Sequence, residues 1–443
     1  MRVGPALLGG AWCAGVLLAA ATLRGAESPA DPFAQLIEQN RRLQEEVRAQ
    51  QQTIEQLAKK LGEVAATADR HERELHELEA RREGPAEAPP STQRENEVRI
   101  GAETGAAFFH TGSDGQFPKD EFRVDDPVIT VEAPVAKEIY FFGELKLLTR
   151  ETNVENFQLG ELYVDLENMS ARWGQPGLLS LRAGRINLPF GEEYLVRTPV
   201  ANPLISHSLS DVWGCDEGVE IYGRLGPAHY VLAVQNGGTS RLHDFNADKA
   251  VVARVSWEPA AWLHLSGSAM RTGELATVAD NLSEVWFANG FFRALGPANR
   301  AGTFWADLFE GDATARWKRG HASAALGEAR FDDSDPLADD ARRLHYGYVE
   351  LVQEIADRLY GAARYSEIRA PRGYPLAGWG NAGRYFFSPL LTEELRRLSV
   401  GVGYRLADPV VLKFEYAWES GRLVGGGRRD NEDFLGSELA VKF

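Results

Sequence analysis

Cysteine is scarce in this chain of 443 residues, which has two, Cys13 and Cys215. Because Cys13 lies in a segment that we expect to be removed, the mature chain can form no intramolecular disulfide and no cysteine metal site. The nine histidines show no metal-ligand spacing. The phosphate-cradling loop, the dinucleotide fingerprint and the nucleophile elbow are also missing. We therefore expect no metal, no cofactor and no enzymatic activity, and the net charge of −16 argues against nucleic acid as a partner.

Long apolar runs are equally rare. The one strongly apolar stretch, residues 3–23, follows Arg2 and leads into small residues. This layout is typical of a secretory signal peptide, so we assign residues 1–26 to a signal peptide and expect the protein to be exported. The stretch is short and interrupted by Pro5, which disfavours a membrane anchor.

Residues 31–83 carry a heptad pattern, in which apolar residues recur at alternating steps of three and four. Such a pattern predicts an α-helical coiled coil with other chains, and therefore oligomerisation. Asn40, Gln50 and His71 occupy core positions, and the mixture of core residues leaves both two and three strands open. Residues 84–96 are rich in proline and glutamate, and we interpret them as a linker.

From residue 97 to residue 443 the pattern changes to short stretches in which apolar and polar residues alternate. In one of them, Leu412 and Phe414 alternate with Lys413 and Glu415. A period of two indicates β-strands with one apolar and one polar face. About sixteen such strands can be placed, an even number, as single-chain bacterial membrane barrels require.

The connections between these strands alternate between short turns and long polar segments. Short turns are expected at Ala133–Ala136, Gly226-Pro227, Pro259-Ala260, Arg319-Gly320, Ala356-Asp357 and Ala407-Asp408, and long segments at 189–216, 237–248, 272–310, 332–341, 368–394 and 419–432. Short turns at one end and long loops at the other are typical of outer-membrane barrels, with the short end in the periplasm. We therefore predict that residues 97–443 form an all-β membrane barrel of antiparallel strands, preceded by the coiled coil.

The sequence ends on Phe443, with Leu439 and Val441 before it on the same face of an alternating strand. Such a strand resembles the closing strand of bacterial outer-membrane barrels. In those proteins the terminal aromatic residue is part of the signal that the barrel assembly machinery reads, so we expect this role for Phe443. A secreted β-sandwich also alternates, but it explains neither the order of the turns nor this ending.

One motif narrows the class of barrel. Ala183-Gly184-Arg185 runs through Leu188-Pro189-Phe190-Gly191 into the third long segment, and Asp216-Glu217-Gly218-Val219 with Tyr222-Gly223 follows that segment. This arrangement resembles the phosphate-selective porin O/P family over most of residues 98–443. The resemblance implies a sixteen-stranded homotrimeric porin whose third loop folds inward, and an N-terminal coiled coil in the periplasm is known in some relatives.

The resemblance places the pore constriction in the third long segment and the pore lining on inward-facing strand positions. The constriction candidates are Glu192, Glu193, Arg197, His207 and Asp211. The pore-lining candidates are Glu144, Lys146, Glu161, Asp165, Arg182, Arg185, Arg254, Arg364, Arg397, Arg405, Lys413 and Glu415. A phosphate dianion needs several cations to offset its desolvation. Because acids and bases are mixed here, we expect general diffusion of small hydrophilic solutes or ions rather than strict phosphate selectivity.

Other interpretations rest on weaker patterns. The barrel could anchor a structural tether whose coiled coil engages the cell wall. Residues 331–340 hold five aspartates, but their spacing does not match a calcium loop, so we expect a solvated acidic loop. His264 and Ser266 share a strand face without an obvious orienting acid, so a hydrolase is not favoured. The expected partners are outer-membrane lipid, the assembly machinery, further copies of the chain and small solutes.

Overall fold

The computed structural model describes residues 97–147, 158–212, 214–237, 247–276, 303–332, 341–385 and 390–443. The predicted signal peptide, coiled coil and linker lie outside the described residues, as does most of the Asp-rich segment. In the described part of the chain, no helix is long and apolar enough to cross a membrane.

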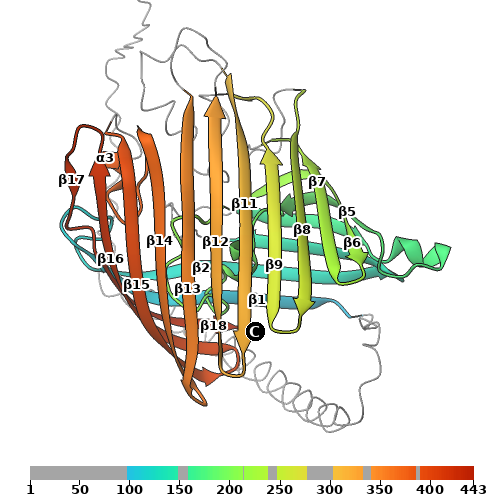
Figure 1. Cartoon of the computed structure of the whole chain (residues 1–443). Helices are drawn as coiled ribbons and strands as arrows, with labels where there is room; N and C mark the ends of the chain where they lie inside the picture. Colours follow the sequence, from blue (N-terminus) through green and yellow to red (C-terminus); the bar gives the residue numbers. More distant parts are fainter. Residues whose placement is uncertain are drawn as a thin grey trace, which may run out of the picture. The chain divides into compact units, whose positions relative to one another are not determined.

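The structure is built almost entirely of strands (Figure 1). The long strands are β1 (Arg99–Thr111), β2 (Glu121–Ala136), β3 (Ile139–Lys146), β4 (Gln158–Leu166), β5 (Ser180–Asn187), β6 (Cys215–Leu225), β7 (Ala228–Gln235), β8 (Ala250–Ala260), β9 (Leu263–Arg271), β11 (Thr303–Trp317), β12 (Gly320–Asp332), β13 (Arg342–Ala356), β14 (Leu359–Tyr374), β15 (Thr392–Ala407), β16 (Val410–Leu423) and β18 (Phe434–Lys442). The short elements are β10 (Leu275–Ala276), β17 (Arg428–Arg429), the 3₁₀ helices η2 (Met169–Trp173) and η3 (Glu193–Val196), and α3 (Ala382–Tyr385).

The long strands form one closed antiparallel barrel, because the last strand pairs with the first. Ala106 of β1 lies opposite Leu439 of β18, and β18 also pairs with β16. The backbone N–H of Phe443 donates to the carbonyl of Ala102 at 2.9 Å, and the N–H of Ala102 donates back at 3.1 Å. Closure leaves no unpaired edge. The predicted all-β barrel of about sixteen strands is confirmed.

Alternation along each strand separates an apolar outer face from a polar inner face. On β16, Phe414 and Trp418 point outward and are 51% and 47% exposed, whereas Lys413 and Glu415 point inward and are buried. Successive side chains of a strand point to opposite faces, so this division follows directly from the sequence pattern. Trp257, at the short-turn end, also belongs to the outer face and is 48% exposed.

Several strand boundaries differ from the sequence-based prediction, and β14 and β16 run to Tyr374 and Leu423, inside the segments predicted as loops. β2 continues through Pro134 to Ala136, and a register shift between Pro134 and Ala136 accommodates the proline. The turn therefore lies at residues 137–138, because a bulge tolerates a residue that cannot donate to the ladder. β11 begins at Thr303, well inside the segment predicted as a loop.

At the long-loop end, the loops that contain Gly115, Gly380 and Asn431 pack together. Phe109, Phe117, Trp379 and Phe434 form a buried aromatic cluster, in which the rings of Trp379 and Phe434 stack at 4.0 Å. Arg429 is buried beside them and donates to the carbonyls of residues 376 and 377 at 2.6 Å each. This end of the barrel is therefore partly filled by side chains.

Candidate functional site

The third loop, residues 188–214, connects β5 to β6 and contains η3. Its entry into the barrel is fixed at Gly191, whose N–H donates to Ser268 Oγ at 3.0 Å and whose carbonyl accepts from Arg254 Nη1 at 2.9 Å. Gly191 has a φ of +68°, and a Cβ there would lie 2.4 Å from Glu310 Oε1. Glycine is the residue that permits both this backbone conformation and this close approach.

The far part of the loop is held by a carboxylate on β16. Glu415 Oε2 accepts the backbone N–H groups of Ile205 at 2.6 Å and Ser206 at 2.7 Å, and Glu415 Oε1 accepts the Ser206 hydroxyl. All three groups are buried. A buried carboxylate that accepts several donors is satisfied without a free cation, so the structure places Glu415 beneath the loop as an anchor.

Lys413, two residues earlier on the same face, holds the loop through its carbonyls. The Nζ atom donates to the carbonyl oxygens of Pro199 at 2.6 Å and Leu204 at 3.0 Å, and it pairs with Glu438 Oε2 at 2.6 Å. The side chain is 1% exposed. Burial of this ammonium is compensated by the paired carboxylate and the carbonyl acceptors.

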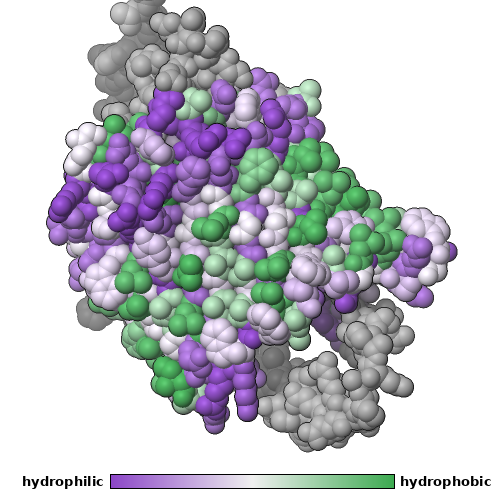
Figure 2. All heavy atoms as spheres, in the orientation of Figure 1, coloured by the Kyte–Doolittle hydropathy of each residue, from purple (hydrophilic) through white to green (hydrophobic). Residues whose placement is uncertain are grey.

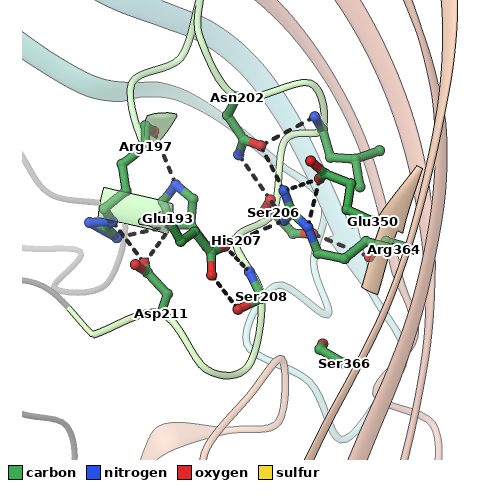
Figure 3. A network of polar contacts seen from close by, with 12 residues as sticks. Glu193, Arg197, Asn202, Ser206, His207, Ser208, Asp211, Glu350, Arg364 and Ser366 are labelled. Carbon is green, nitrogen blue, oxygen red and sulfur yellow. Dashed lines mark hydrogen bonds and ion pairs between the residues drawn. The ribbon is translucent and has the colours of Figure 1, made fainter. Parts of the chain in front are cut away.

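Two arginines complete the set of contacts between the wall and the loop. Arg364 on β14 donates to the Ser206 carbonyl at 2.7 Å and pairs with Glu350 at 2.5 Å (Figure 3). Arg397 on β15 donates to the His207 carbonyl at 3.1 Å and pairs with a buried acid, Glu419, at 2.7 Å. We call the inner face of β13–β16 the covered wall, because four of its charged side chains contact the loop: Arg364, Arg397, Lys413 and Glu415.

The loop is also braced internally. Arg197 Nε pairs with Asp211 Oδ2 at 2.7 Å, and Arg197 Nη2 lies 2.9 Å from His207 Nδ1 (Figure 3). His207 Nε2 lies 3.1 Å from the Arg197 carbonyl, which only accepts. Because arginine only donates, the Arg197 contact favours His207 Nδ1 as an acceptor with the proton on Nε2, and Asp211 Oδ2 lies 3.5 Å from the same Nδ1. A further candidate, Glu193, accepts the Ser208 N–H at 2.7 Å and is buried.

A group of charged residues stays partly exposed on the opposite side of the barrel. We call the inner face of β3–β6 the open wall. Arg182 pairs with Asp165 at 3.0 Å and Glu220 at 3.2 Å, and its guanidinium stacks on Tyr163 at 4.3 Å. Its side chain is 24% exposed. Partly exposed inward-facing candidates also include Glu144, Lys146 and Glu161.

A second mixed cluster joins the loop to β8 and β9. Glu192 lies 3.7 Å from Arg254 and 3.3 Å from His264. The Arg254 guanidinium stacks on the ring of Tyr194 in η3 at 5.3 Å. Burial raises the pKa of Tyr194 to about 12. Of the five constriction candidates, the structure therefore keeps Glu192 and Arg197 partly exposed and buries the other three.

Two pore-lining candidates occupy other places. Arg185 lies on the strand face opposite to Arg182, next to Glu217, with which it pairs at 3.0 Å. The reason is the period of two, which puts residues three apart on different faces. Arg405 is inward-facing but exposed near the short-turn end, over the ring of Tyr360 at 5.6 Å.

Several functional residues were missed at the sequence level, namely the acids that pair with the covered wall. Glu350, Glu419 and Glu438 each lie on an adjacent strand and face inward beside a base. These pairs could have been predicted only if the register between neighbouring strands had been known, because each inward-facing acid lies beside an inward-facing base of the next strand. Near the rejected serine–histidine pair, Ser266 donates to Asp312 at 3.0 Å, and His264 lies between Glu192 and Glu258.

Solved structures of other proteins have the same closed β-barrel fold. OmpT of Vibrio cholerae, folded in vitro, gives a TM-score of 0.51 at 10% identity, over 78% of this chain and 97% of that chain. The chain shares the barrel fold of these outer-membrane proteins. The trimer form of OmpT gives 0.50 at 10% identity over 78% and 99%, and OprB of Pseudomonas putida gives 0.51 at 9% identity over 78% and 94%. No family model and no curated protein matches the chain.

Proposed function

We propose that the protein is an outer-membrane porin, which forms a water-filled channel for passive uptake of small hydrophilic solutes or ions. The observation that carries this proposal is the open wall. Charged side chains on the inner face of a closed barrel, left partly exposed beside a folded-in loop, require water within the barrel. The apolar outer face matches a lipid environment, and no chemical reaction is part of the proposal.

The covered wall argues for loose selectivity. Arg364, Arg397 and Lys413 each pair with a buried acid and with loop carbonyls, so their charges are already neutralised. A phosphate dianion would have to displace these partners to reach the cations. On the open wall, Lys146 and Arg182 face Glu144 and Glu161, and this mixture favours general diffusion. Membership of the phosphate-selective O/P family remains a hypothesis carried by the motif around Gly191.

We also propose a homotrimer with residues 31–83 as a periplasmic coiled coil. The heptad pattern supports oligomerisation, and a trimer form is known for OmpT of Vibrio cholerae. Phe443 would act in recognition by the assembly machinery. The alternative role as a cell-wall tether has no support among the described residues.

Planar-bilayer recording of the purified full-length protein tests the channel. Stable open steps that occur in multiples of three support a trimeric pore, and persistent silence under all voltages contradicts the proposal. The reversal potential in a potassium chloride gradient tests selectivity, for which we expect a value near zero. A reversal potential close to the chloride equilibrium value would contradict loose selectivity and favour an anion channel.

A further inference from the structure

A groove of about 690 Å³ crosses the outer face of the barrel over β8, β9, β11, β12 and β13. Its floor is made by small residues, Ala253, Gly267, Ala269 and Gly311. All four lie on the outer face. Gly267 and Ala269 are in register with the exposed residues Val255 and Phe309, and Gly311 and Ala253 are in register with Gly267 and Ala269. The groove is apolar along most of its length.

Two of the three glycines that line the groove, Gly267 and Gly311, are not required by the fold. Gly267 and Gly311 lie directly opposite each other on β9 and β11, and neither has a positive φ. A Cβ built on either glycine would meet its nearest atom at 3.9 Å, which is an ordinary contact. Glycine weakens a strand interior and often marks a site where a ligand approaches closely. The pair therefore keeps open a space that larger residues would fill.

Charged residues close the groove at its long-loop end. Glu328 and His345 line it there, and Glu328 lies 2.5 Å from Arg330 and 3.1 Å from Arg343. The row continues along the outer face: Arg369 lies 3.7 Å from Glu394, Arg396 lies 3.4 Å from Glu367, and Arg422 lies 3.7 Å from Glu394. Figure 2 shows this end of the strands as a hydrophilic zone above a more hydrophobic surface.

The row of ion pairs has little value for stability. Exposed ion pairs are weakened by water and salt, and each contributes little to stability. The arginines of the row remain about half exposed, so their guanidinium groups are accessible from outside the barrel. A guanidinium binds a phosphate through two parallel hydrogen bonds, and its always-charged fork suits this geometry better than lysine does.

We propose that the groove and the arginine row together bind a phosphate-bearing lipid of the outer leaflet. An acyl chain lies along Gly267 and Gly311, and the phosphate sits at Arg330, Arg343 and Arg369, where the apolar surface ends. Each of these arginines already pairs with a glutamate, but unlike the buried arginines of the covered wall they are about half exposed. A guanidinium has five N–H donors, so it can bind a phosphate beside its carboxylate partner, and the adjoining groove favours a lipid over free phosphate. This inference rests on the proposed outer-membrane orientation, but not on conduction.

Native mass spectrometry of the detergent-solubilised protein tests the proposal, with bisphosphorylated lipid A as the probe. We expect R343Q/R369Q to weaken retention by at least about tenfold, since it removes two charge-assisted contacts. Gly311→Leu, whose Cβ would meet its nearest atom at 3.9 Å, fills part of the groove and should also weaken retention. Gly361→Leu is the matched control, because it adds the same side chain on the outer face of β14 and should leave retention unchanged.

Two further arms separate the possible sources of the ligand. Dephosphorylated lipid A should bind as weakly as R343Q/R369Q does, and millimolar inorganic phosphate should not displace lipid A. Equal retention in wild type and both variants would overturn the proposal, as would full displacement by phosphate. A change of oligomeric state in Gly311→Leu, with lipid retention unchanged, would instead assign the groove to a second copy of the chain. Unaltered conductance in these variants keeps this test separate from that of the channel.

Discussion

Lys413 and Lys146 both point into the barrel, but their surroundings differ. Lys413, on the covered wall, is 1% exposed and contacts two loop carbonyls and Glu438. Lys146, on the open wall, is 20% exposed and lies 3.5 Å from Glu144. The same side chain thus supports the third loop on one side and belongs to the proposed pore surface on the other. The position of the loop, rather than the residue type, decides between these roles.

The largest expected effect comes from Lys413→Met on the covered wall. The change leaves Glu438 buried without its cation, and loss of one partner from a buried pair costs about 3–5 kcal/mol. Urea unfolding of the refolded barrel in detergent measures this loss. Lys442→Met is the control, because Lys442 is 60% exposed and its pair with Glu103 should contribute less than about 1 kcal/mol. Equal losses in both variants would contradict the special contribution of the buried pair between Lys413 and Glu438.

Glu415→Gln should have the next largest effect. The amide cannot accept all three loop donors, and a hydrogen bond to a charged group contributes about 1.5–3 kcal/mol. We therefore expect a loss of about 2–3 kcal/mol in unfolding free energy and greater open-channel noise, because the loop is held less firmly. The matched change on the open wall, Glu144→Gln, should leave the noise unaltered. Quiet channels in Glu415→Gln would show that the loop is held elsewhere.

We expect Tyr194 in η3 to have a smaller effect on the unfolding free energy, and this effect depends on pH. Its pKa in the folded protein is raised to about 12, above that of an unfolded tyrosine, so the folded state resists loss of the proton. The stability contributed by the neutral phenol is therefore complete below about pH 10 and is lost as the pH rises to 12. At pH 11 the wild type should have lost about 1.4 kcal/mol relative to Tyr194→Phe. Parallel stability curves from pH 8 to 11 would contradict this prediction.

Arg182→Gln on the open wall should have the smallest energetic effect and a clear electrical one. A unit charge about 6 Å from a permeating ion in water is worth about 0.7 kcal/mol, or about threefold in relative permeability. The reversal potential should move toward cation preference. Arg364→Gln removes the same charge from the covered wall and should leave the reversal potential of the channels that still form unaltered. A shift in Arg364→Gln alone would reverse the assignment of the two walls.

The sequence predicts the fold well because its main signal is local. Alternation along Val410–Trp418 determines which residues of β16 face outward, and a period of two needs no knowledge of the neighbouring strands. The boundary of β2 was missed because Pro134 is accommodated by a bulge that depends on its partner strand. The division of charges into two walls is not local either. The contact of Glu415 with the Ser206 backbone spans 209 residues, and a single sequence carries no sign of it.

The long span of the loop contacts has a consequence for assembly. The third loop is translated well before β13–β16, so its donors and acceptors stay without their anchors until those late strands are paired. A slip of one residue in β16 would turn Glu415 and Lys413 toward the outer face and bring Phe414 beneath the loop. The contacts of the loop therefore favour the correct strand register, since they form only when the last third of the barrel has closed correctly.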